Sequence, residues 1–185
     1  METQHQHSAL KSSERSIRHC RILAQAASLT AMVIGVLTLI GWVGGFAVLK
    51  TVLHGAVSMK VNTAIGFVLA GFALGLRVRT SASAPGTLRS QLARISSGAA
   101  AFLGLGTLAE YLLNINPGLD QIFLRQELTA GDTAPGRMAQ ATALGIALLG
   151  LAICFLDDKR VAIRRGAPAC AFVAMLIGII ALVGY

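Results

Sequence analysis

Five long apolar segments decide what this chain can fold into. The hydrocarbon core of a bilayer is roughly 30 Å thick, so a spanning helix needs about 20 apolar residues. In lipid, a helix satisfies its own backbone hydrogen bonds. The 185 residues are 55% hydrophobic and only 13% charged. The sequence therefore predicts an all-α polytopic membrane bundle with five transmembrane helices, at about 22–49, 61–76, 95–115, 138–156 and 167–184.

Basic residues alternate between the connecting segments. Four precede the first span, four join the second span to the third, and four join the fourth to the fifth, whereas each of the other two loops holds two. Under the positive-inside rule, this pattern predicts a cytoplasmic N-terminus and places residue 185 at the outer face. The net charge of +8 then reflects topology and contact with the lipid bilayer, and no nucleic-acid partner is expected. Residues 1–21 are expected to form a disordered cytoplasmic tail.

Part of the sequence occurs twice. Met59–Ala73 (MKVNTAIGFVLAGFA) returns as Met138–Ala152 (MAQATALGIALLGLA), with seven residues identical in register. A second pattern, G-x3-L-x2-[WY], begins at Gly35, Gly104 and Gly178. The sequence therefore predicts tandem two-helix repeats, each made of an aromatic-ended helix and a Met-led helix. The third repeat is interrupted at Tyr185, so we expect its Met-led helix to follow as a sixth span.

Glu110 is the one acidic residue inside a predicted span. It lies about five residues, or roughly 7 to 8 Å, from the outer end of that span. An ionisable group at this depth is costly and is expected to face the bundle or a wet cavity, which makes it a candidate functional site. The structural alternative is that Glu110 reaches the outer interface or bonds a neighbouring helix only for assembly.

Other polar and aromatic side chains are expected at the same depth. Aromatic residues end the first and third spans, and amide or hydroxyl residues begin the second and fourth; these are Trp42, Tyr111, Asn62, Thr63 and Thr142. Together with Glu110 they are predicted to surround a shared outer cavity that takes a ligand, lipid or quinone. Within the outer loop, residues 119–128 are expected to form a short interfacial helix.

Small residues recur four apart at Gly41/Gly45 and Gly71/Gly75. Such pairs allow helix backbones to approach closely, either within one chain or in a homodimer, and packing within the chain is the simpler expectation.

Several classes of chemistry have no support in the sequence. No Gly-rich loop is followed by Lys and Ser or Thr, as a phosphate site requires. The three cysteines and four histidines show no Cys-x2-Cys or His-x3-His spacing, and His5 and His7 are better explained by a solvated tail than by a weak metal site. No histidine lies inside a span where it could hold haem. We therefore expect no catalytic residue, no cofactor and no bound metal.

Several motifs resemble those of a known family. Asn62-Thr63-Ala64, Glu110-Tyr111, Asp120-Gln121 and residues 135–138 (PGRM) are similar to the multi-pass membrane module at the N-terminus of many bacterial sensor histidine kinases and diguanylate cyclases. The second repeat departs from that family at Ala141, where Asn would be usual. The resemblance implies a sensory input module in the bacterial inner membrane, followed by a cytoplasmic signalling domain. The alternatives are a small transporter-like protein or another integral membrane protein.

Overall fold

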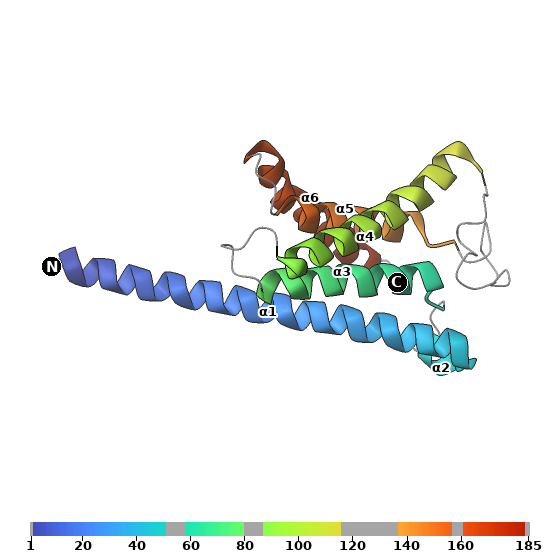
Figure 1. The fold of residues 1–185 in the computed structure, drawn as a ribbon, viewed down its shortest axis with the longest axis horizontal. Coiled ribbons are helices and arrows are strands. Elements are labelled where there is room, and N and C mark those ends of the chain that lie inside the picture. The colour runs from blue at the N-terminus through green and yellow to red at the C-terminus, as the bar shows by residue number, and fades with distance from the viewer. Residues whose placement is uncertain (1, 51–57, 80–86, 116–136, 157–160, 184–185) are drawn as a thin grey trace.

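The computed structural model describes residues 2–50, 58–79, 87–115, 137–156 and 161–183, and within them the regular secondary structure is all helix (Figure 1). The helices are α1 (Glu2–Gly44), α2 (Ala47–Lys50), α3 (Val61–Arg79), α4 (Leu88–Leu113), α5 (Gln140–Phe155) and α6 (Val161–Val183). The predicted all-α class is confirmed.

Four of these helices, α1, α3, α4 and α6, are long and apolar enough to cross a membrane. They indicate that the protein resides in one. The fourth predicted span is shorter than expected, because α5 has 16 residues and is therefore about 24 Å long. Ala139 has an extended backbone, with φ −60° and ψ 147°, so the helix begins only at Gln140.

The first helix differs from its predicted bounds at both ends. It begins at Glu2, although residues 1–21 were expected to be disordered. The physical reason is that residues 2–34 contain neither Gly nor Pro, so nothing in the backbone interrupts a helix before Gly35. Gly45, with a φ of 73°, ends the helix because glycine adopts left-handed backbone angles without a steric penalty.

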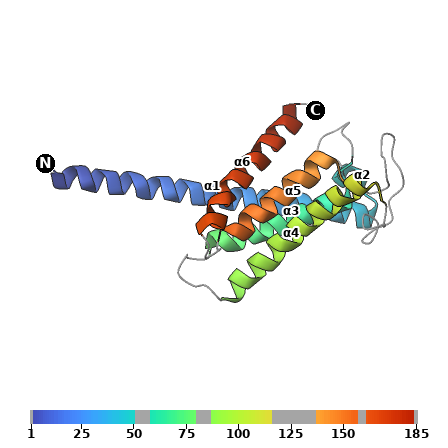
Figure 2. The same ribbon diagram turned by 90° about the horizontal axis from the view of Figure 1, so that it is seen from above.

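The helices pack in a continuous series. α1 lies against α3, α3 against α4, α4 against α5 and α5 against α6, while α3 also touches α5. The N-terminal part of α1 projects beyond the bundle (Figure 1). α6 crosses the others obliquely and leads away from them (Figure 2). The series therefore has α1 at one end and α6 at the other.

Small residues make up much of the interior, beside a few large ones such as Met138 and Ile146. Ala64, Ala73, Ala93, Ala100 and Ala143 have no exposed surface. In contrast, many Leu, Ile, Val and Phe side chains of the long helices are exposed. Lipid provides no hydrophobic drive for helices to associate, so close packing of small residues takes its place. The distribution suits a bundle surrounded by hydrocarbon.

The first close approach between helices recurs in the two halves of the bundle. A Cβ built on Gly35 of α1 would lie 2.6 Å from the carbonyl oxygen of Ala64 in α3. A Cβ on Gly104 of α4 would likewise collide with the carbonyl oxygen of Ala143 in α5. Gly35 and Gly104 occupy the same position in the repeated pattern, and so do Ala64 and Ala143. Corresponding residues therefore make corresponding contacts.

A second close approach recurs seven residues, or about two helical turns, further along each helix. A Cβ on Gly71 would lie 2.8 Å from the carbonyl oxygen of Ser28, and one on Gly150 would lie 2.7 Å from that of Ser97. These four residues also correspond between the two copies. Gly71 thus serves packing within the chain, as expected for the small-residue pair that it forms with Gly75, whose Cβ would meet the Ser28 hydroxyl at 2.6 Å.

Candidate functional site

The C-terminal end of α4 is shaped by Asn114. This residue has a φ of 51° and a ψ of 36°, a left-handed conformation that Asn tolerates better than most residues. Its backbone N–H donates to the carbonyl oxygen of Glu110, and the N–H of Ile115 reaches the same oxygen at 3.2 Å. The carbonyl groups at the end of the helix are thereby partly satisfied. The chain then turns so that the Ile115 carbonyl is available to Arg137.

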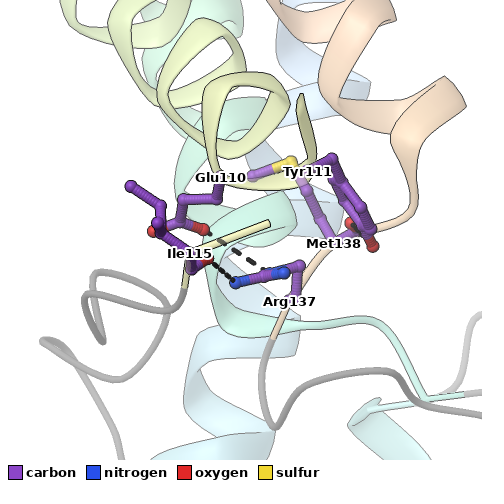
Figure 3. Close-up of polar contacts among 5 residues, drawn as sticks. All are labelled: Glu110, Tyr111, Ile115, Arg137 and Met138. Atoms are coloured by element: carbon purple, nitrogen blue, oxygen red, sulfur yellow. Dashed lines mark hydrogen bonds and ion pairs between the residues drawn. The ribbon is translucent and has the colours of Figure 1, made fainter. Parts of the chain in front are cut away.

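Glu110 and Arg137 form a buried ion pair at this end of the bundle (Figure 3). The Nε of Arg137 lies 3.5 Å from the Oε2 of Glu110, and the two side chains are only 8% and 3% exposed. Arg137 lies just before α5, so the pair joins the end of α4 to the approach to α5. Each charge is costly to bury alone, and each partner compensates the other.

Arg137 makes two further contacts with the end of α4 (Figure 3). Its Nη2 donates to the carbonyl oxygen of Ile115 at 3.0 Å. Its guanidinium carbon lies 5.1 Å from the centre of the Tyr111 ring, which allows a cation–π interaction. The C-terminal end of a helix carries partial negative charge, so a cation is favoured there. One side chain therefore contacts Glu110 and Tyr111 in the last turn of α4 and Ile115 just after the helix ends.

Trp42 and Tyr111 each donate a side-chain hydrogen bond to the backbone of a methionine, Met59 just before α3 and Met138 just before α5. The Tyr111 hydroxyl donates to the Met138 carbonyl oxygen at 3.1 Å, and Trp42 Nε1 donates to the Met59 carbonyl oxygen at 2.8 Å. Met59 also accepts a contact of 3.4 Å from the Thr38 hydroxyl at its sulfur. The two aromatic residues correspond in the repeated pattern, and so do the two methionines.

The remaining predicted residues lie at the starts of the Met-led helices. Asn62 and Thr63 are buried in the first turn of α3, with 3% and 8% exposure, and Thr142 is half-buried in the first turn of α5. The ends of α1 and α4 and the starts of α3 and α5 lie at the same end of the bundle (Figure 1). All six predicted residues are thus at one end.

Direct contacts join some of these residues. Arg137 contacts both Glu110 and Tyr111, while Trp42 donates a hydrogen bond to Met59, just before α3. A single cavity lined by all six residues stays a prediction. The expected interfacial helix at residues 119–128 lies outside the described residues. Within the described segments, no group of three or more His, Cys, Asp or Glu side chains could hold a metal ion.

Arg137 is the residue of this site that sequence analysis missed. It entered there only as part of the motif at residues 135–138. A signal was present, because a lone Arg at the start of an apolar helix needs a partner and Glu110 is the one acid within a predicted span. The two residues are far apart in the chain, so only their relative depth could have suggested the pair.

Comparison with protein-family models, with curated proteins and with solved structures found no match.

Proposed function

We propose that this chain is the sensory input module of a bacterial signalling protein, embedded in the inner membrane with a cytoplasmic N-terminus. The stimulus acts at the outer end of the bundle, where Glu110, Arg137 and Tyr111 lie. The output is a cytoplasmic signalling domain attached to the module. The buried Glu110–Arg137 pair is the observation that carries this proposal.

The module is built from tandem two-helix repeats. In support, α1 packs on α3 through the same sequence positions that α4 uses on α5, including both close glycine approaches. The aromatic hydrogen bond to the leading Met carbonyl also recurs. A duplicated unit explains these matches better than separate origins, because unrelated helix pairs have no reason to place equivalent contacts at equivalent positions.

The ion pair distinguishes the second unit from the first. The positions that correspond to Glu110 and Arg137 in the first unit are Gly41 and Ser58, which carry no charge. A buried ion pair adds little net stability compared with apolar packing. Ionisable residues within membrane spans commonly mark functional sites. A charge pair present in one unit alone therefore supports a role beyond assembly.

The same geometry supports a switching mechanism. Arg137 holds the end of α4 to the segment that leads α5 through the ion pair, the Ile115 carbonyl and the Tyr111 ring. A charged or strongly polar ligand that competes for Arg137 or Glu110 would release this connection. The two arrangements of α4 and α5 then differ in free energy, and a ligand that prefers one of them shifts the population.

The test measures signalling output from the protein with its output domain attached. Glu110→Gln and Thr63→Val are expected to reduce the difference between stimulated and unstimulated output to less than about one third of that of the parent protein. Gln91→Ala is the control, because Gln91 is exposed near the opposite end of α4. Unchanged signalling by both site variants under every stimulus would sink the assignment. Substrate flux in proteoliposomes would instead favour a transporter.

A further inference from the structure

The last helix, α6, is the least covered of the long helices. Within the most apolar stretch of 18 residues in each helix, the buried share is only 6% in α6, compared with 39% in α4 and 44% in α3. α6 packs on α5 and stands at the end of the series of helices. Such a surface can contact either lipid or another helix. The residues on it show which of the two it suits.

The repeated pattern aligns α6 with α1 and α4. Gly178 corresponds to Gly35 and Gly104. Counting back along each helix by the same spacing, Met175 corresponds to Met32 and Ala101, and Ala171 corresponds to Ser28 and Ser97. These positions are spaced i, i+4 and i+7, so they share one face of a helix.

In α4, two neighbouring faces are both used. One carries Ala93 and Ser96, and the Ser96 hydroxyl donates to the Leu69 carbonyl oxygen of α3 at 3.0 Å. The other carries Ser97 and Gly104, which meet α5. An aromatic-ended helix of this type therefore packs on the preceding Met-led helix with one face and on the following one with the next face.

In α6, only the first of these faces is used. Ala167, the equivalent of Ala93, is 2% exposed. Ile177 approaches Gly145 of α5, where a Cβ would lie 4.0 Å from its Cγ2. The second face is open: Ala171 and Met175 are exposed, and a Cβ on Gly178 would meet nothing within 4 Å. This face corresponds to the one with which α1 packs on α3 and α4 packs on α5. In α6 it is uncovered.

We propose that the face formed by Ala171, Met175 and Gly178 is a docking surface for an apolar membrane helix of the Met-led type, running antiparallel to α6. This partner continues the series of interfaces already formed by α1 with α3 and by α4 with α5. It replaces lipid because the exposed glycine permits the same close backbone approach that is seen twice in the bundle.

The two existing interfaces specify what the docking helix carries. Opposite Gly178 it needs a small residue, as Gly35 meets Ala64 and Gly104 meets Ala143. Opposite Met175 it needs a glycine, because Met32 at the corresponding position lies over Gly71, with its Cγ 2.9 Å from the Cβ position. The partner is therefore a helix with an Ala and a Gly seven residues apart on one face.

The test measures association in vesicles of phosphatidylcholine and phosphatidylglycerol. The full chain carries alanine at its three native cysteine positions and a donor fluorophore on Arg164→Cys, an exposed position near the start of α6. The probe is a synthetic peptide of residues 137–158, with Cys154→Ala and an acceptor at its C-terminus. An antiparallel arrangement brings the two dyes together. Saturable energy transfer at least about twofold above that of a scrambled peptide is expected.

Matched variants locate the interface. Gly178→Leu in the chain, or Gly150→Leu in the peptide, is expected to reduce transfer to the level of the scrambled peptide. Gly166→Leu is the control, because Gly166 lies on another side of α6 and a Cβ there also meets nothing within 4 Å. Ala171→Leu is a second variant of the same face and is expected to reduce transfer in the same way. Circular dichroism must show that every variant keeps the helix content of the parent chain.

Two results would overturn this proposal. One is transfer that equals the scrambled peptide or is unaffected by Gly178→Leu, which would leave the face to lipid. The other is transfer between two chains that Gly178→Leu abolishes, which would show that a second copy occupies the face. Since association is measured without any signalling output, these results are separate from the test of the proposed function.

Discussion

Arg137 is held in position by several groups at the C-terminal end of α4 and just after it. Asn114 turns the chain in a left-handed conformation, the Ile115 carbonyl becomes available, and the carboxylate of Glu110 supplies the opposite charge. The cation also lies where the helix dipole is negative. These contributions are local, yet they depend on α5 approaching from a distant part of the chain.

The ion pair is expected to be strongly coupled. Glu110→Gln or Arg137→Gln alone leaves one buried charge uncompensated, which costs about 3–5 kcal/mol of unfolding free energy. The double variant removes both charges and is expected to lose much less than the sum of the two single variants. The measurement is unfolding in mixed micelles by circular dichroism, arranged as a double-mutant cycle.

Gln91→Ala provides the control for this cycle, because its side chain is exposed at the other end of α4. A purely additive result, with a coupling energy below about 0.5 kcal/mol, would contradict the pair.

At the scale of the helices, close packing between neighbours depends on glycines, which have no side chain to separate the two backbones. A Cβ on Gly104 would collide with the Ala143 carbonyl oxygen and would lie 2.7 Å from the Ala147 nitrogen, whereas a Cβ on Gly106 would meet nothing within 4 Å. The two glycines lie in the same helix, two residues apart. They therefore separate the effect of helix propensity from that of interhelical contact.

Gly104→Ala is expected to destabilise the protein by about 1–3 kcal/mol, since the added methyl group forces α4 away from α5. Gly106→Ala is expected to be neutral or to stabilise by up to about 1 kcal/mol, because Ala favours a helix over Gly. Unfolding in mixed micelles measures both. Equal effects of the two substitutions would show that α4 does not approach α5 as closely as described.

The extension of α1 illustrates a second property of the elements. Nothing in residues 2–34 interrupts a helix, so the helix that crosses the bundle continues towards the N-terminus. The described side chains from Ser13 to Ile22 are exposed. Burial therefore does not account for this part of α1, which continues the apolar helix through a stretch without Gly or Pro.

At the scale of the whole molecule, the proposed orientation follows from charge. Cys20 lies among the basic residues before the apolar part of α1, and Phe46 lies in the turn after it. Both are exposed. The positive-inside rule places the first in the cytoplasm and the second outside.

We expect a membrane-impermeant maleimide to label Phe46→Cys in cells with a permeabilised outer membrane and an intact inner one. It should label Cys20 only after lysis. Each cysteine is tested alone, in chains with Cys154→Ala and Cys170→Ala, and with Cys20→Ala in the Phe46→Cys chain. Labelling of Cys20 before lysis, with Phe46→Cys protected, would invert the orientation and move Glu110 to the cytoplasmic side.

Much of the helical content could be predicted from the chain. The predicted spans overlap α1, α3, α4, α5 and α6, because each requires a run of apolar residues. Their ends were less accurate. α5 starts later than predicted because Ala139 is extended, and α1 starts earlier because no Gly or Pro interrupts the helix in the polar N-terminal residues. Hydropathy locates the part of a helix that suits lipid and is insensitive to where the helix begins or ends.

The candidate site was predicted in part. Glu110 could be singled out because a lone acid in an apolar helix is costly. Arg137 could not be assigned to it, since pairing two residues from different helices requires the distance and direction between those helices. Trp42 and Tyr111 were placed correctly at helix ends. Their hydrogen bonds to Met59 and Met138 depend on the path of the chain before α3 and α5, which the sequence does not give.

The sequence by itself determined that the chain is helical and apolar enough for a membrane, because lipid leaves backbone groups to be satisfied within each helix and sets the length of its apolar run. The tertiary structure decided which small residues meet. It placed Gly35 on Ala64 and Gly104 on Ala143, paired Glu110 with Arg137, and left Gly178 uncovered. Those outcomes depend on the relative rotation and depth of neighbouring helices, which van der Waals contact and charge compensation select only when the helices pack together.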